Sequence, residues 1–214
     1  MDWEVSFHYS EAMTLEVRLK LLKDAAQLST LFRTLEPLSN AIEDLNTWIV
    51  VKGSTHKPED LVLDGDAQEL EEALLGVAFV ACQAGMTFVA ARARNLAEYC
   101  RTNGVVALVG WETKEKIYGL GEEALPGGPS KIFFLNAVAN YFKHRDEWED
   151  TEWANLSKKN KPTAQSIAQL GLSRYAKDNL RRATAVLDDA IFEAVKVWAG
   201  SLVDQAEKEL ATHL

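Results

Sequence analysis

The chain has 214 residues, enough for one large domain or two small ones with a substantial hydrophobic core. Its formal net charge of −9, from 32 acidic and 23 basic residues, repels a polyanion overall and argues against an extended duplex-binding surface. Five prolines and 12 glycines are too few for a multi-strand sandwich with a turn every ten or so residues, so a mainly α fold is expected.

Apolar and polar residues alternate over residues 3–9, and this period of two predicts a half-buried strand. Residues 105–109 are the candidate partner strand, so a small β appendage is expected beside the helices. The N-terminus has neither a basic segment nor an apolar segment of the secretory type, which makes the cytoplasm the expected compartment.

A helical spacing of apolar residues begins near Met13 and continues to Leu35. Pro37 is expected to break or kink this helix, and to open a second one that runs to about Val51. Residues 13–51 are therefore predicted to form an N-terminal helical pair.

The next helix is expected from about residue 66 to residue 101, with Asp66 as its cap and Asn103 and Gly104 as its stop. Residues 73–91 contain no charged side chain, a length that meets the threshold for a membrane span. Many of them are glycine or alanine, so we expect a buried central helix of a bundle and no membrane partner. Cys82 and Cys100 lie on this one helix, too far apart to pair, and are expected to be reduced thiols.

Glycines and prolines mark residues 105–130 as a mobile connection. A helix is then predicted over 132–148 with Ser130 as its cap, a short one from Thr163 to Gly171, and a last long one over 178–210. No linker divides the chain, so residues 1–214 are predicted to be a single α-helical domain. Its bundle core covers about 66–210, with the pair 13–51 packed on it.

Residues 132–148, IFFLNAVANYFKHRDEW, hold the candidate site, because amide, basic, imidazole and carboxylate side chains gather there. At roughly 100° per residue, five of them share one helix face: Asn136, Asn140, Lys143, His144 and Glu147. They can converge on one small ligand, or they can form the solvated face of an amphipathic helix. Arg145 projects on the apolar side, where it needs an acidic partner or a ligand phosphate.

The residues ANYFKHRDEW, with the helical layout from about 66 to 210, resemble the HEPN superfamily of α-helical bundles from bacterial toxin-antitoxin and anti-phage systems. Many members are metal-independent RNases that act as dimers. The resemblance implies roles for Asn140, Lys143 and His144 as catalytic residues, for Asn136, Glu147 and Arg145 as binding residues, and a homodimer. HEPN nucleases carry an arginine four to six residues before the histidine, and this chain lacks it, which implies a divergent or non-catalytic member.

Two other interpretations stay open at this point. His144, Asp146, Glu147, Glu149 and Asp150 are ligands suited to magnesium or manganese, with Glu69 and Glu72 as a partner set, as in a metal-dependent nucleotide hydrolase. Alternatively, Trp111, Trp148 and Trp153 lie in or beside predicted loops, which suits a non-catalytic protein-interaction or regulatory module. We expect a divergent HEPN-like protein of bacterial defence or stress response that binds RNA or a phosphate-bearing ligand through Asn140, Lys143 and His144, without a cofactor.

Overall fold

The computed structural model describes residues 13–53, 60–121, 124–126, 128–149, 152–158, 160–173, 176–188 and 190–214. In this part of the chain 74% of the residues are helical and no strand occurs, which confirms the mainly α fold. Residues 105–109 form an irregular loop in which Leu108 has a left-handed φ of 56°, so the strand predicted there is wrong. Its predicted partner, residues 3–9, lies outside the described residues.

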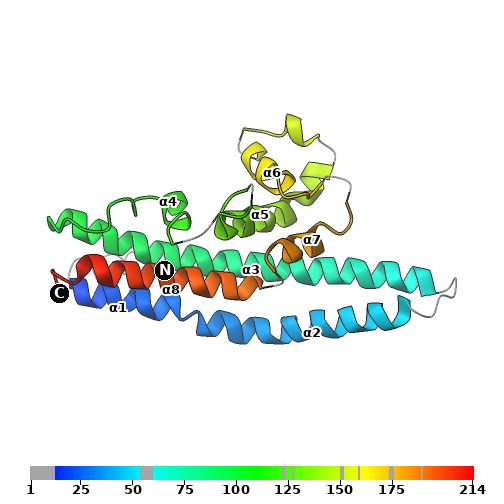
Figure 1. Ribbon diagram of the computed structural model, residues 1–214, viewed down its shortest axis with the longest axis horizontal. Coiled ribbons are helices and arrows are strands. Elements are labelled where there is room, and N and C mark those ends of the chain that lie inside the picture. Colours follow the sequence, from blue (N-terminus) through cyan, green and yellow to red (C-terminus); the bar gives the residue numbers. More distant parts are fainter. Residues whose placement is uncertain are drawn as a thin grey trace, which may run out of the picture. The chain divides into compact units, whose positions relative to one another are not determined.

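The chain divides into two compact units. The first unit comprises residues 1–28, 86–121 and 196–214, and the second comprises residues 29–85 and 122–195. Two long helices, α3 (Asp60–Thr102) and α8 (Ile191–Leu210), contribute to both (Figure 1).

The first unit also contains α1 (Leu15–Ala26) and the short α4 (Lys114–Tyr118). Its core is built around Trp198, which is fully buried. The indole Nε1 of Trp198 donates to the carbonyl of Ile117 at 3.3 Å, and its ring meets Tyr118 edge to face with centroids 5.6 Å apart. This hydrogen bond satisfies the one polar atom of the Trp198 side chain, as is usual for a buried tryptophan.

The second unit contains α2 (Ser29–Gly53), α5 (Lys131–Glu149), a 3₁₀ turn at Trp153–Asn155, α6 (Lys161–Ala168) and α7 (Asn179–Val186). Helix α6 packs on α5, as Figure 1 shows. Helix α5 has the predicted position and cap, since the backbone N–H of Phe133 donates to Ser130 Oγ at 3.3 Å.

Two predicted helix starts in the first half of the chain are wrong. Pro37 lies inside α2, and the break comes earlier, at Leu28, whose φ of 49° ends α1. Helix α3 begins at Asp60, so Asp66 lies within it and does not cap it.

Two predicted boundaries in the second half also differ. Thr163 lies within α6, which begins at Lys161 with Pro162 in its first turn, while Gly171 takes the expected left-handed φ of 88°. The predicted last helix over 178–210 is interrupted between α7 and α8, where Asp188 has a φ of 54°. No glycine or proline marks that turn, and the local signal for it is aspartate, which tolerates a left-handed backbone.

Helix α3 contains a window with a mean hydropathy of 1.9, long and apolar enough to cross a membrane, and 56% of that window is buried within the protein. Phe79, Cys82, Met86 and Val89 are fully buried. This burial agrees with the prediction of a central helix in a bundle.

The thiols of Cys82 and Cys100 are both free and buried. Burial raises the pKa of Cys82 to about 12 and raises the pKa of Cys100 as well.

The thiolate is the nucleophile, so with this pKa only about one Cys82 side chain in 10,000 is reactive at pH 8. We expect no alkylation of Cys82 by iodoacetamide at pH 8 in the native protein and full alkylation in urea, measured by mass spectrometry. Rapid native labelling would show that α3 opens readily.

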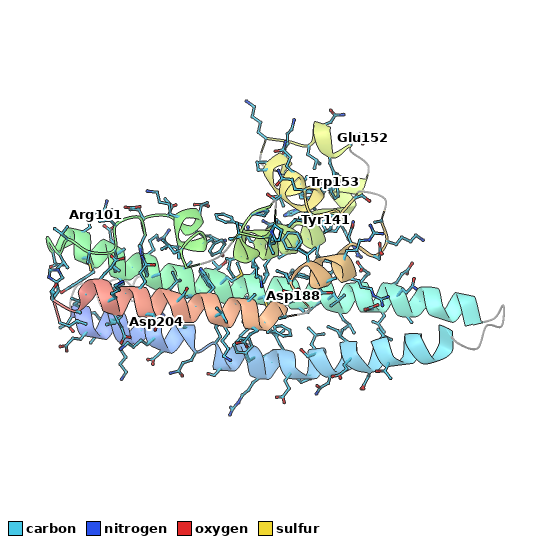
Figure 2. All side chains as sticks on the ribbon, in the orientation of Figure 1. Arg101, Tyr141, Glu152, Trp153, Asp188 and Asp204 are labelled. Atoms are coloured by element: carbon cyan, nitrogen blue, oxygen red, sulfur yellow. The ribbon has the colours of Figure 1, made fainter. Side chains whose placement is uncertain are left out.

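The tryptophans next to predicted loops are mostly core residues. Trp111 is fully buried and Trp148 is 1% exposed, which contradicts the interface role considered for them. Trp148 and Trp153 pack with Tyr141 in one cluster, with ring centroids 5.8 to 6.3 Å apart. Figure 2 labels Tyr141 and Trp153, which lie close together beside α6. This cluster fixes the C-terminal half of α5 within the second unit.

Candidate functional site

The polar face of α5 meets one residue of α3, Gln83, which is 8% exposed. The Nε2 of Gln83 donates to Oδ1 of Asn136 and to Oδ1 of Asn140, each at 2.9 Å. The Nζ of Lys143 donates to Gln83 Oε1 at 2.7 Å. The structure therefore brings Asn136, Asn140 and Lys143 of the predicted site together around one glutamine, which we call the Gln83 network.

The chemistry of lysine fixes the orientation of every amide in the Gln83 network. An ammonium group has only donors, so it is the oxygen of Gln83 that faces Lys143. The amide nitrogen of Gln83 then faces the asparagines, which must offer their oxygens to it. As a result, the Nδ2 groups of Asn136 and Asn140 are directed away from Gln83.

These outward groups are donors without acceptors. Within the described part of the chain, neither Asn136 nor Asn140 donates a side-chain hydrogen bond. Both asparagines are half-buried and Lys143 is exposed, so solvent or a ligand can reach them. Two amide nitrogens and one ammonium group thus form a small array of hydrogen-bond donors, which suits a ligand rich in acceptors and negative charge.

His144 and Glu147 continue the same face of α5. Nδ1 of His144 lies 3.2 Å from Oε1 of Glu147, one helical turn away, and their side chains are 42% and 67% exposed. A polar contact this exposed contributes little to stability. Its effect is local: Glu147 occupies one ring nitrogen of His144 and places a carboxylate near the end of the donor array.

Arg145 is half-buried. Its guanidinium lies over the ring of Phe142, 5.2 Å from the centroid, which is a cation–π contact. This contact is with a residue of the apolar face, on which helical spacing places Arg145.

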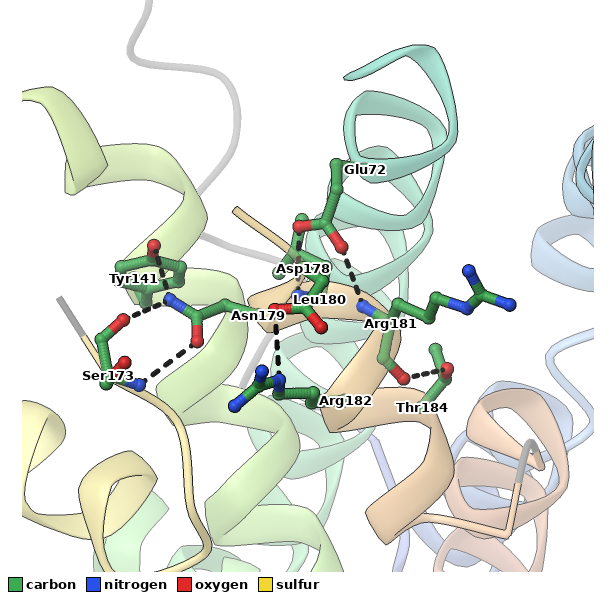
Figure 3. A network of polar contacts seen from close by, with 9 residues as sticks. All are labelled: Glu72, Tyr141, Ser173, Asp178, Asn179, Leu180, Arg181, Arg182 and Thr184. Carbon is green, nitrogen blue, oxygen red and sulfur yellow. Dashed lines mark hydrogen bonds and ion pairs between the residues drawn. The ribbon is translucent and has the colours of Figure 1, made fainter. Parts of the chain in front are cut away.

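No metal centre is seen among the residues that the structure describes, since no three histidine, cysteine or acidic side chains there are placed so that they could hold one metal ion. The predicted ligands Asp146, Glu149 and Asp150 lie outside the described side chains. Glu72 has a different role: its carboxylate accepts the backbone N–H groups of Leu180 and Arg181 at 3.0 and 2.9 Å. It thereby caps the start of α7, where Asp178 provides no side-chain cap (Figure 3).

Sequence reasoning missed Gln83 as a site residue. One signal for it exists, because Gln83 and Thr87 are polar side chains within the uncharged run of α3. A polar residue in a buried helix needs a partner, and Gln83 finds its partners on α5. The identity of those partners, 53 to 60 residues away, cannot be read from the local pattern.

Comparison of the chain with known protein families, with characterised proteins and with solved structures finds no similar protein. The resemblance of the ANYFKHRDEW stretch to HEPN proteins stays a prediction, and the function has to be inferred from the site's own chemistry.

Proposed function

We propose that the chain is a divergent HEPN-like protein that binds a phosphate group of RNA or a nucleotide at the donor array of Asn136, Asn140 and Lys143. A phosphate offers several acceptor oxygens and a negative charge, and both match an array that contains donors and one cation. The net charge of −9 opposes extended contacts with a nucleic acid, so the ligand is a short single-stranded segment or a mononucleotide.

The observation that carries this proposal is the orientation of the two asparagine amides. Each asparagine accepts from Gln83 through Oδ1, so the bonds that join α3 and α5 also turn two amide donors toward solvent or a ligand. The Oδ1 atoms of Asn136 and Asn140 accept hydrogen bonds from Gln83, so their Nδ2 groups remain available to a ligand. This arrangement positions the donors before a ligand arrives, which lowers the entropy lost on binding.

The contacts of the basic residues favour binding over cleavage. An RNase of this kind needs a histidine for proton transfer and a cation at the phosphate. Lys143 is held by Gln83, His144 is held by Glu147, and Arg145 lies over Phe142. None of these contacts pairs His144 with a cation, so we propose a binding protein without RNase activity of the usual kind.

The Asn140→Asp variant is the sharpest test. It keeps Oδ1 as an acceptor for Gln83 but replaces the outward donor with a charged oxygen that repels phosphate. We expect at least a tenfold loss of affinity for a fluorescein-labelled 12-nucleotide single-stranded RNA in fluorescence anisotropy, and a similar loss for Lys143→Gln. Tenfold corresponds to about 1.4 kcal/mol, within the usual range for a hydrogen bond to a charged group.

Two control variants make the same substitutions, Asn to Asp and Lys to Gln, at exposed positions away from the proposed site. Asn95→Asp and Lys208→Gln alter exposed side chains of α3 and α8, and should change affinity less than twofold. Because one ammonium group at the site neutralises one phosphate, a plot of the logarithm of the RNA association constant against the logarithm of the salt concentration should have a slope of about −0.7. Equal losses in the site variants and the controls would attribute binding to net charge and refute the site. Competition with ADP distinguishes a mononucleotide from RNA as the preferred ligand.

A further inference from the structure

A cavity of about 570 Å³ lies within the second unit and shares no residue with the Gln83 network. Helices α2, α3 and α7 and the start of α8 provide its walls. Each of these helices contributes apolar side chains to the wall: Ile42, Leu75, Ala78, Ala185, Ile191 and Phe192. Sites for small organic molecules occupy roughly 300 to 1,000 Å³ and have mainly apolar walls, so this cavity has the size and the lining of a ligand site.

The protein itself covers the apolar walls of the cavity only in part. Ile42 belongs to the apolar face of α2, yet it is half-buried, and so is Phe192 of α8. The ring of Phe192 is held beside the cavity by Phe32, which it meets at 86° with ring centroids 6.4 Å apart. A ligand in the cavity would remove apolar surface of Ile42 and Phe192 from water, which is the main favourable term when an apolar body binds.

The charged side chains that line the cavity are of both signs. Glu71 is 3% exposed and has Arg181 among its partners, with the guanidinium Nε 4.0 Å from Oε1 of Glu71. An anionic ligand would meet the carboxylate of this pair and a cationic ligand its guanidinium, and either would lose its hydration among apolar walls. Glu43 also lines the cavity, but it is exposed and water screens its charge. A neutral ligand avoids these costs.

Two hydroxyl groups are the neutral polar side chains of the cavity wall. Thr184 is 8% exposed, and its Oγ1 donates its one proton to the carbonyl of Arg181 at 2.7 Å. The oxygen of Thr184 can therefore only accept a further hydrogen bond. Within the described part of the chain, no group donates to Thr184 Oγ1 and the Ser39 hydroxyl makes no hydrogen bond. Because buried polar groups are normally paired, a ligand with an O–H or N–H group would complete the site.

We propose that the cavity binds a neutral aromatic molecule that carries one hydroxyl or N–H group. Its rings lie against the apolar walls beside Phe192, since aromatic rings pair favourably with one another, and its donor is directed to Thr184 Oγ1. A pure hydrocarbon fills the same space but leaves the threonine oxygen without a donor. This site is separate from the phosphate site at the Gln83 network, so each of the two can fail alone.

The test uses the full chain and N-phenyl-1-naphthylamine, a neutral aromatic probe with one N–H group whose fluorescence rises in apolar surroundings. We expect saturable binding of this probe. Three competitors then share one naphthalene body and differ in charge: 2-naphthalenemethanol, 2-naphthoic acid and 2-naphthylmethylamine. The neutral alcohol should displace the probe at a concentration about tenfold lower than the acid or the protonated amine requires, because only the charged competitors lose hydration of a full charge.

Thr184→Val keeps the shape of the side chain and removes the acceptor oxygen. It should weaken binding of the alcohol about fivefold, and it should change the affinity for 2-methylnaphthalene, which has no donor, by less than about twofold. Thr34→Val is the matched control. Thr34 of α2 also donates its hydroxyl to a carbonyl one turn earlier, but it is exposed and lies outside the cavity, so its replacement should change neither affinity.

Ala78→Leu fills the cavity from α3 and should abolish probe binding, whereas Ala84→Leu, at an exposed position of the same helix, should leave it unchanged. Circular dichroism shows whether each variant is folded, and Ile42→Trp fills the same space from α2 if Ala78→Leu does not fold. Displacement of the probe by the acid or the amine at the concentration of the alcohol would overturn the proposal. Absence of probe binding, or unchanged binding in a folded filling variant, would overturn it as well.

Discussion

Replacement of Asn179 by alanine is expected to lower the free energy of unfolding by about 3 kcal/mol, since it removes three hydrogen bonds of the side chain at about 1 kcal/mol each. Asn179 is 1% exposed and lies at the start of α7. Its Nδ2 donates to Tyr141 Oη at 2.9 Å and to the carbonyl of Ser173 at 2.6 Å, while its Oδ1 accepts the N–H of Ser173 at 3.1 Å (Figure 3).

The position of Asn179 lets its side chain join three parts of the second unit. It connects the segment before α7 to the aromatic cluster at the end of α5, because Tyr141 packs against Trp148 and Trp153. Loss of the side chain thus affects the helix start, the preceding turn and the cluster together. Single substitutions that break a buried hydrogen-bond network in this way are among those that lower the free energy of unfolding most.

Urea denaturation followed by circular dichroism measures the effect of Asn179→Ala. Tyr141→Phe removes one hydrogen bond of the same network and should cost about 1 kcal/mol. The double variant should then lose less than the sum of the two single losses. Asn160→Ala is the control, because the side chain of Asn160 caps no helix and its loss should change stability by less than about 0.5 kcal/mol. A loss below 1 kcal/mol for Asn179→Ala would contradict this account.

The sequence predicts the helices better than it predicts where they end. Apolar spacing correctly identified the helix over 132–148, and Ser130 caps it as expected. The breaks at Leu28 and Asp188 were missed because both residues adopt left-handed backbone conformations, which are uncommon for leucine and less so for aspartate. Leu28 is buried, and a local pattern contains no information about the packing around it.

The candidate site shows the same limit. Helical periodicity places Asn136, Asn140 and Lys143 on one face, and the structure brings them together. Which of their atoms face outward depends on Gln83, more than fifty residues earlier in the chain. The sequence therefore shows which side chains on this face can donate hydrogen bonds. The direction in which the asparagine amides donate depends on their tertiary contact with Gln83.

The close contact between α3 and α5 predicts a second large effect, this time from adding a single methyl group. A Cβ on Gly76 would lie 2.1 to 2.5 Å from ring atoms of Phe142, closer than atoms can approach. Overpacking of this kind costs about 1 to 3 kcal/mol. Gly→Ala in a helix interior otherwise gains about 1 kcal/mol. The ring of Phe142 is also covered by Arg145, so it cannot turn away freely, and overpacking here should cost about 2 to 3 kcal/mol, a net loss of about 1 to 2 kcal/mol for Gly76→Ala.

Gly65→Ala is the matched control for Gly76→Ala, because it lies in the same helix and a Cβ there meets nothing within 4 Å. It should stabilise the protein by about 0.5 to 1 kcal/mol, so the two variants should shift the urea midpoint in opposite directions. Gln83 lies about two helical turns beyond Gly76 on α3. A displaced α5 should therefore also weaken RNA binding in Gly76→Ala, and Phe142→Leu in the same chain should restore both properties. Stabilisation by Gly76→Ala would mean that α5 does not rest on α3 at this glycine, and the orientation of the Asn136 and Asn140 donors would lose its structural basis.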